Sequence, residues 1–421
     1  MIEILEKSKT LPTKVKLLLK KGVRMTAPFS VEIGEEVNLD KIDASLIIYG
    51  AARIKGEQTL ISPNVKLGYE APVVLINCQL GNGVELKGGY FSESVFLDNV
   101  VIGSNAQVRS GCLLEEQVGG NHSVGLKQTI LFPFVTLGSL VNFCDCLMGG
   151  GTSRKNHSEV GSSYVHFNYT PQQDKATPSL IGDVPRGVML REAPIFLGGQ
   201  GAIAGPVQIA YGTVISAGVV CRTDCLKEEM IVSHPPKPAS SKKFYPGLYG
   251  DVSHKVASNI LYVANLLALR QWYRYVRHGF FVREKYGDDL YAGSQKVLEG
   301  ALTERIVQLR IFAKNLEKAA TREKEIKRIF SVKAWRSQDQ FLKNWPAMEE
   351  YLLKGNEENI SLKRKESFLK IVKKQSGKFK TYLEAVKLLT PLQAQRGSAW
   401  LNDIVQSTIS GCLSIYQRKK Q

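Results

Sequence analysis

The sequence predicts an all-β, left-handed parallel β-helix (a hexapeptide solenoid), followed by an all-α C-terminal helical domain. Two observations lead to this fold class. From about residue 33 to residue 220, aliphatic residues recur every six positions, and a glycine often follows, as in Ile102-Gly103. Beyond residue 249, apolar residues instead recur at helical spacing, opposite faces that are rich in lysine and arginine.

The six-residue period has a direct structural meaning. It matches neither the 3.6-residue period of a helix nor the two-residue alternation of an isolated strand. It fits a coil with three short flat faces, in which each face directs one aliphatic side chain into a triangular core and small residues occupy the tight corners. Each coil can cover its apolar edge only by stacking on the next coil, so the array is a solenoid. The cleanest series comprises Leu197, Ile203, Ile209 and Ile215.

The charge distribution divides the chain. Its 421 residues carry a net charge of +17, but residues 1–241 hold 22 Lys+Arg against 22 Asp+Glu, whereas residues 242–421 hold 34 against 17. The change coincides with the stretch PPKPASSKK at 235–243. The predicted organisation is an N-terminal extension over 1–28, a β-helix domain over 29–234 with loop insertions at 142–158 and 166–195, a linker over 235–248 and a basic α-helical domain over 249–421.

The C-terminal region predicts a bundle of about five to seven helices, separated by glycine and proline breaks. Its basic runs, such as Lys363-Arg364-Lys365, could contact phosphates, which makes nucleic acid or an anionic surface a candidate partner. A solvated charged face is the alternative interpretation, because the sequence contains no zinc-finger spacing and no RNA-binding aromatic signature.

Three features bear on location. No uninterrupted apolar stretch approaches the roughly 18 residues that span a bilayer, so we expect no transmembrane segment. The N-terminal stretch MIEILEKSKTLPTKVKLLLKK lacks a continuous apolar core and a small-residue cleavage site, so we expect no signal peptide. The seven scattered cysteines do not suggest a disulfide framework, and this usage favours a cytoplasmic protein.

The segment FLGGQGAIAGPVQIAYGTVISAG at 196–218 resembles the acetyltransferase half of the bifunctional bacterial enzyme that makes UDP-N-acetylglucosamine, within the hexapeptide-repeat, trimeric left-handed β-helix transferase superfamily. Gly205-Pro206-Val207 and Ala217-Gly218 stand in the family's columns without gaps. The upstream matches to the family's IGAGTITCNYDG, lysine and IGD are Val160-Gly161, Phe167-Asn168-Tyr169, Lys175 and Ile181-Gly182-Asp183. The detailed likeness covers about sixty residues, within a hexapeptide likeness over about 190.

This resemblance implies an acyl donor, acetyl-CoA or another acyl-CoA, bound along a groove at Asn168, Tyr169, Gly199 and Ala217. Backbone groups at an exposed coil edge can bond the pantetheine amides, and glycine or alanine at the corner permits close approach. The resemblance also implies an amino-sugar or nucleotide-sugar acceptor, and a homotrimer with sites between adjacent prisms. Lys175 would meet a phosphate as a point charge.

The sequence departs from the family pattern on the acceptor side. The column of the family's catalytic histidine holds Asp145, and the columns of its sugar-binding tyrosine and asparagine hold Met148 and Glu159. The column of its late donor-side arginine holds His234, and the insertion VPRGVMLREAPI follows Asp183. The sequence also lacks the glycine-rich nucleotide-binding domain of a pyrophosphorylase, so we do not expect that activity.

Acyl transfer to an amine or hydroxyl needs a base for the attacking group and donors for the tetrahedral oxyanion. The candidate catalytic residues are His166, His157 and Asp145, which lie within or beside the interruptions of the repeat. A loop-bracing role is the alternative for both histidines. A carboxylate is a poor base unless burial raises its pKa.

The glycine-rich run GGGTSRK at 149–155 is a candidate for binding an anionic substrate, with Arg154 and Lys155 beside Lys175 as substrate-binding residues. A plain exposed loop is the alternative. Cys144-Asp145-Cys146 together with His157 could suggest a metal site. Cys-x-Cys does not have the spacing of a zinc knuckle, however, and cysteines often fill such coils, so we predict no metal site.

The leading hypothesis is therefore a hexapeptide-repeat acyltransferase-like protein that transfers an acyl (acetyl) group from acyl-CoA to an amino-sugar or nucleotide-sugar substrate. The alternative is a non-catalytic sugar-nucleotide-binding or scaffold protein whose basic helical domain acts as an adaptor.

Overall fold

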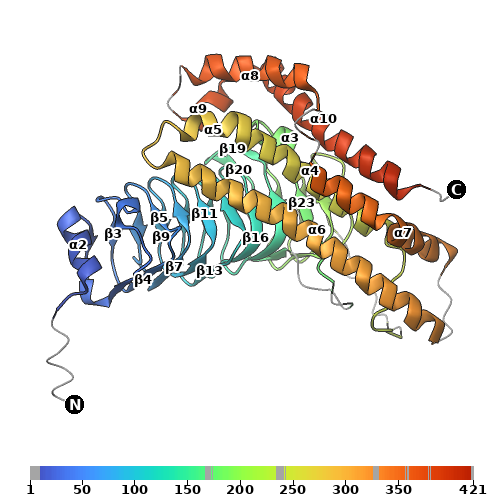
Figure 1. Ribbon diagram of the computed structural model, residues 1–421, viewed down its shortest axis with the longest axis horizontal. Helices are drawn as coiled ribbons and strands as arrows, with labels where there is room; N and C mark the ends of the chain where they lie inside the picture. The colour runs from blue at the N-terminus through green and yellow to red at the C-terminus, as the bar shows by residue number, and fades with distance from the viewer. Residues whose placement is uncertain are drawn as a thin grey trace.

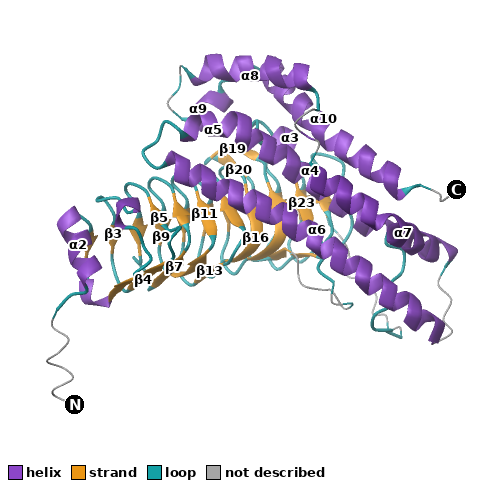
Figure 2. Ribbon diagram, in the orientation of Figure 1, coloured by secondary structure: helices purple, strands orange, loops and turns teal. Residues whose placement is uncertain are grey.

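The computed structural model describes residues 10–165, 174–233, 243–325, 331–355, 360–377 and 381–418, together with the single positions 172, 241, 357 and 379. Figures 1 and 2 show a parallel β-solenoid with long helices lying along its side. This architecture confirms the predicted parallel solenoid of hexapeptide coils and the helical C-terminal region.

The coils form a prism with three faces, named A, B and C in chain order. Face A is an 11-stranded parallel sheet. Its strands are β1 (Arg24–Met25), β3 (Ile47–Ile48), β6 (Lys66–Leu67), β9 (Glu85–Leu86), β12 (Val101–Ile102), β15 (Gly119–Gly120), β17 (Thr136–Leu137), β21 (Glu159–Val160), β24 (Phe196–Leu197), β27 (Val214–Ile215) and β29 (Ile231–Val232).

Faces B and C are joined because two seven-residue strands, β16 (Gly125–Leu131) and β18 (Asn142–Met148), bend from one into the other. The other strands of face B are β2 (Val31–Ile33), β4 (Ala52–Lys55), β7 (Val73–Ile76), β10 (Gly89–Ser92), β13 (Ala106–Val108), β22 (Tyr164–Val165), β25 (Ala202–Ile203) and β28 (Val220–Cys221). Those of face C are β5 (Leu60–Ile61), β8 (Gln79–Leu80), β11 (Ser94–Phe96), β14 (Cys112–Leu114), β23 (Ser179–Ile181) and β26 (Gln208–Ile209).

The residues of the six-residue period fill the interior of the prism. Leu67 stands in register with Leu86 on the next coil, and Leu86 with Ile102 on the one after, and all three are fully buried. The edge between faces B and C turns through residues in the left-handed region, as at Gln128 and Asp145, where φ is 49° and 54°. Asp145 therefore stands at a corner of the prism.

Helices occupy both ends of the chain. Near the N-terminus, α2 (Thr13–Lys21) closes the first coil because Val15 and Leu18 join the prism core. Short 3₁₀ turns follow at η1 (Pro28–Ser30) and η2 (Leu39–Lys41). The remaining helical segments are α3 (Val184–Gly187), α4 (Ser253–Trp272), the π-helical η3 (Tyr273–Arg277), α5 (His278–Phe281), α6 (Gly287–Glu325), α7 (Val332–Lys354), α8 (Leu362–Ser376), α9 (Tyr382–Lys387) and α10 (Pro391–Tyr416).

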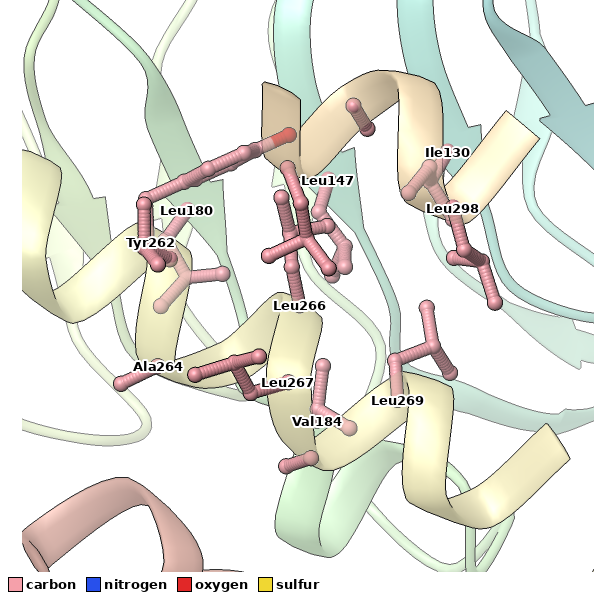
Figure 3. Packing of buried hydrophobic residues seen from close by; sticks show 14 of the residues in the cluster. Ile130, Leu147, Leu180, Val184, Tyr262, Ala264, Leu266, Leu267, Leu269 and Leu298 are labelled. Atoms are coloured by element: carbon pink, nitrogen blue, oxygen red, sulfur yellow. The ribbon is translucent and has the colours of Figure 1, made fainter. Parts of the chain in front are cut away.

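The C-terminal helices cover face C, because most outward side chains of this face are apolar and share one core with α4 and α6. Figure 3 shows this packing, with Leu147 and Leu266 among the labelled residues. The outward residues of the solenoid in this core are Leu60, Val95, Leu113, Ile130, Leu147 and Leu180. Each such side chain contributes about 1.5–3 kcal/mol on full burial, so the helices and the solenoid form one packed unit.

Among the helices that the structure describes, none combines the length and the apolar character that crossing a bilayer would demand.

Candidate functional site

The predicted site residues lie on three different edges of the prism. Gly199 and Ala217 lie at the A/B edge, in the turns after β24 and β27. Asp145 and Lys175 lie at the B/C edge, between strands of faces B and C. Arg154, Lys155 and His157 lie at the C/A edge, where β19 (Gly151–Ser153) and β20 (Asn156–His157) form an antiparallel hairpin. His166, Asn168 and Tyr169 fall outside the described residues, as does His234.

The three edges keep the predicted site residues apart. Face A separates the C/A edge from the A/B edge, and face B separates the A/B edge from the B/C edge. Within one chain, the described residues among the predicted set therefore do not gather in one pocket. Sequence spacing could not reveal this, because the length of each interruption does not show which corner of the prism it occupies.

Asp145 is held by an arginine from the helical region. The Arg305 side chain on α6 is 2% exposed, and its Nη2 lies 2.5 Å from Oδ1 of Asp145. Nη1 of Arg305 also donates a hydrogen bond to the carbonyl oxygen of Lys175, at 3.3 Å. The residue in the column of the family's histidine is thus the carboxylate of a buried ion pair. This contact occupies Oδ1 of Asp145 and ties the carboxylate to α6.

Arg154 makes a comparable structural contact at the C/A edge. Its Nη1 donates to the carbonyl oxygens of Gln117 and Phe134 and to Oγ1 of Thr136, at 3.0, 2.8 and 2.8 Å. It therefore ties the hairpin to two coils, whereas the side chain of Lys155 is exposed. Nδ1 of His157 is buried and has no hydrogen-bond partner among the described residues.

At the A/B edge, the two predicted donor-groove positions that the structure describes, Gly199 and Ala217, carry a hydrogen atom and a methyl group as side chains. A Cβ atom at Gly199 would meet the nitrogen of Ser162 at 3.7 Å, an ordinary contact, and one at Gly218 would meet nothing within 4 Å. By contrast, a Cβ at Gly198 would lie 2.4 Å from the nitrogen of Ala217, so this glycine is required for the coils to stack. The edge is thus closely stacked yet open on its outer side.

A cluster of buried carboxyl groups at the C/A edge was not predicted from the sequence. Glu115 is 1% exposed, accepts a hydrogen bond from the Tyr273 hydroxyl at 2.5 Å and lies 4.0 Å from the guanidinium of Arg277. Glu116 bonds both terminal nitrogens of Arg277. Burial raises the pKa of Glu115 to about 7 and that of Asp98 to about 6. The signal was the Glu-Glu pair directly after the apolar strand β14.

The cysteines of the 144–146 segment do not point to one ligand set. The Cys146 side chain lies in the prism core, and burial raises the pKa of the Cys144 thiol to about 11. His157 lies on a different edge. The described part of the chain contains no cluster of three or more His, Cys, Asp and Glu side chains able to hold a metal ion.

A polar cavity of about 220 Å³ lies at the B/C edge beneath α6. Amide and carboxylate side chains line it, including Gln58, Asn77, Glu93 and Gln128. Oε1 of Gln128 is buried without a hydrogen-bond partner among the described residues. Such a lining can bond hydroxyl groups, the chemistry of a sugar or polyol.

No protein-family model matches the chain. Over 217 residues it is 25% identical to the "Bifunctional protein GlmU" of Thermotoga sp. (strain RQ2), a match that covers 50% of this chain and 42% of that protein. Over 193 residues it is 25% identical to the "Bifunctional protein GlmU" of Geotalea uraniireducens (strain Rf4), covering 43% and 38%. The chain thus spans about two fifths of the length of these curated relatives. Homology over half of the chain and a parallel β-solenoid with a six-residue period together fit the hexapeptide-repeat transferase superfamily.

Proposed function

We propose that this protein transfers an acyl group from an acyl-CoA, such as acetyl-CoA, to an amino-sugar or nucleotide-sugar acceptor. The observation that carries the proposal is the open A/B edge at Gly199 and Ala217, the positions that the family resemblance assigns to the donor groove. An extended pantetheine arm could lie against this edge and bond its exposed backbone groups. The likeness to the GlmU proteins over half of the chain supports the assignment.

In this reaction the acceptor nitrogen or oxygen forms a bond to the acyl carbon while the carbon–sulfur bond of the thioester breaks. A base takes the proton of the acceptor, and free CoA thiol leaves. We assign the base to His166, because Asp145 is paired with Arg305 and His157 lies at the C/A edge, away from the donor groove. In the sequence, His166 directly follows β22, the strand of face B that precedes the predicted donor residues Asn168 and Tyr169.

We further propose a homotrimer, as the superfamily resemblance implies. Because the chain's own helices cover face C, subunit contacts would use faces A and B. On face A, Phe196, Val214 and Ile231 are register neighbours on consecutive coils, and Phe196 and Ile231 are 40% and 69% exposed. Such an apolar row suits an interface between subunits.

A second candidate function is sugar-nucleotide binding without catalysis. Two observations favour it: the ion pair that occupies Asp145, and the polar cavity beneath α6 with the unpaired Oε1 of Gln128. In this case helix α6, which covers the B/C edge, would enclose a sugar-nucleotide site there instead of leaving the edge open to an acceptor.

Calorimetry with acetyl-CoA and a thiol-release assay with a panel of amino sugars separate the two functions. The first predicts donor binding that Gly199→Trp abolishes, and turnover that His166→Ala abolishes. His157→Ala is the matched control and should retain both. Binding of nucleotide sugars without binding of acetyl-CoA would refute acyl transfer and support the second function.

A further inference from the structure

Helix α10 borders a polar cavity of about 350 Å³ on the side that faces the solenoid. The cavity lies between α10, α4 and the α3 turn, and amides make up much of its lining. Asn265 is 1% exposed; its Oδ1 accepts from the backbone nitrogen of Val184, and its Nδ2 donates to the carbonyl of Leu261. One N–H of this amide remains for a ligand. The other polar lining residues are Asp183, Arg186, Gln208, Gln395, Ser398, Asn402 and Gln406.

The polar residues at the solenoid end of this cavity are held in place. The Asp183 carboxylate accepts from the backbone nitrogen of Arg186 at 3.0 Å and from its Nε at 2.8 Å. Arg186 also stands over the Tyr211 ring, 4.9 Å from the centroid. Glu192 and Glu228 lie beside the Arg186 guanidinium and balance its charge. This end of the cavity therefore suits the hydroxyl groups of a ligand better than a phosphate.

A second cavity, of about 390 Å³, lies between α10 and α8 and is strongly basic. It adjoins the first, because Gln395 and Ala399 line both. Three cations surround it: Lys363, Arg364 and Arg396. Arg364 is paired with Asp403, whereas Lys363 and Arg396 have no ion-pair partner among the described residues.

The start of α8 adds to this positive potential. Lys363 and Arg364 belong to its first turn, and the N-cap residue Ser361 makes no side-chain hydrogen bond to that turn. Its hydroxyl instead donates to Asp403. The side chain of Ser361 thus does not cap the first turn, and the helix dipole favours an anion at this position.

The basic run noted in the sequence is thus divided by the fold. Lys365 is 8% exposed and lies 3.4 Å from the centroid of the Tyr275 ring, so it is removed from the surface. Lys363 and Arg364 point to the cavity, where Arg396 of α10 joins them. The cations form a local group at one end of a polar groove, whereas nucleic acid would require a continuous basic surface.

We propose that the two adjoining cavities form one binding site for a phosphate ester of a hydroxyl-rich molecule. The phosphate would lie among Lys363, Arg364 and Arg396, and the hydroxyl groups would lie along α10 toward Asn265. This site is separate from the acyl-donor edge and does not depend on the proposed transferase activity. Either a soluble sugar phosphate or a phosphoinositide headgroup has the required chemistry.

The test is calorimetry on the full chain with glucose 6-phosphate, with glucose and inorganic phosphate as partial ligands. We expect saturable binding of glucose 6-phosphate, weaker binding of phosphate and none of glucose. Arg396→Glu should weaken the binding of glucose 6-phosphate at least about tenfold, because the loss of one hydrogen bond to a charged group reduces affinity by about that factor. Lys370→Glu makes the same charge change elsewhere on α8 and should leave the affinity within about twofold.

Two further measurements test the junction of the cavities and the source of the phosphate. Ala399→Trp, at the junction of the cavities, should reduce binding of glucose 6-phosphate more than that of phosphate. Vesicles containing phosphatidylinositol phosphate distinguish a lipid headgroup from a soluble ester, and both sources must depend on Arg396. Lys363→Gln provides a milder variant should Arg396→Glu misfold. Equal affinity in wild type, Lys363→Gln and Arg396→Glu, or absence of saturable binding to both sources, would overturn the proposal.

Discussion

Arg277 should be the side chain on which the docking of the helices depends most strongly. It is 1% exposed and reaches from η3 to the C/A edge of the solenoid, where it faces Glu115 and Glu116. Replacing it by Met keeps the apolar part of the side chain but leaves two carboxyl groups without their cation. Removing one partner of a buried ion pair typically costs about 3–5 kcal/mol.

The cost should depend on pH. Burial already raises the pKa of Glu115 to about 7 with the arginine in place, so without the cation this carboxyl group will protonate more readily. We expect the full cost of Arg277→Met at pH 8 and a clearly smaller cost at pH 5. Adding Glu115→Gln and Glu116→Gln to Arg277→Met should recover most of the loss, because no uncompensated charge remains.

Denaturant unfolding followed by tryptophan fluorescence measures this effect in the helical region. The four tryptophans all lie there, at Trp272, Trp335, Trp345 and Trp400. Lys343→Met, which breaks an exposed i,i+4 pair with Asp339, is the control and should cost less than about 0.5 kcal/mol. A cost of Arg277→Met below about 1 kcal/mol at pH 8, or an equal cost at both pH values, would refute the argument.

Three other predictions use the same unfolding assay. Glu115 has a raised pKa in the folded state, so its contribution to the free energy of unfolding is fully present below about pH 4.5 and is lost as pH rises through about 7. The loss is on the order of 3 kcal/mol. Glu115→Gln should remove this part of the pH dependence of stability, and an unchanged pH profile would contradict the prediction. Gly397→Ala should destabilise the protein by about 1–3 kcal/mol, because two buried side chains lie within 2.7 Å of the new Cβ on α10. Gly300→Ala on α6, with nothing within 4 Å of the new Cβ, should instead stabilise the protein by up to about 1 kcal/mol. Equal effects of the two substitutions would contradict the close packing at Gly397. Asp145→His should cost about 3–5 kcal/mol, because it removes the closer of the two carboxylates beside the buried Arg305, the other being that of Glu304 at 3.8 Å. The substitution should not create acyl transfer, and a variant that is as stable as the wild type and transfers acyl groups would refute this prediction.

Much of the fold was predictable because it depends on contacts between near neighbours in the sequence. Each coil of the solenoid stacks on the next, so one aliphatic residue in six is enough to indicate the prism. The helical spacing after residue 249 similarly predicted helices. The interruptions that the sequence predicted at 142–158 and 166–195 each contain a solenoid strand, β18 (Asn142–Met148) and β23 (Ser179–Ile181), because an irregular sequence can still complete a coil.

The sequence contains a signal for the face on which the helices dock. Face C contains short apolar triplets, such as Cys112–Leu114 in β14, where the middle residue points outward. A strand that is apolar on both sides is typically buried on both sides. This pattern predicts a covering layer for face C, but it does not identify which segment provides it.

By itself, the sequence determined the period of the solenoid and the helical nature of the C-terminal region, and the family resemblance drew attention to Asp145. The tertiary structure alone decided that Arg305, 160 residues further along the chain, neutralises this aspartate, and that Arg277 reaches Glu115 and Glu116. It also decided that α8 and α10 bring Lys363 and Arg396 to one cavity. The physical reason is that these pairings depend on how a helical layer docks on a solenoid face. Apolar burial drives that docking, and it leaves no fixed spacing in the sequence.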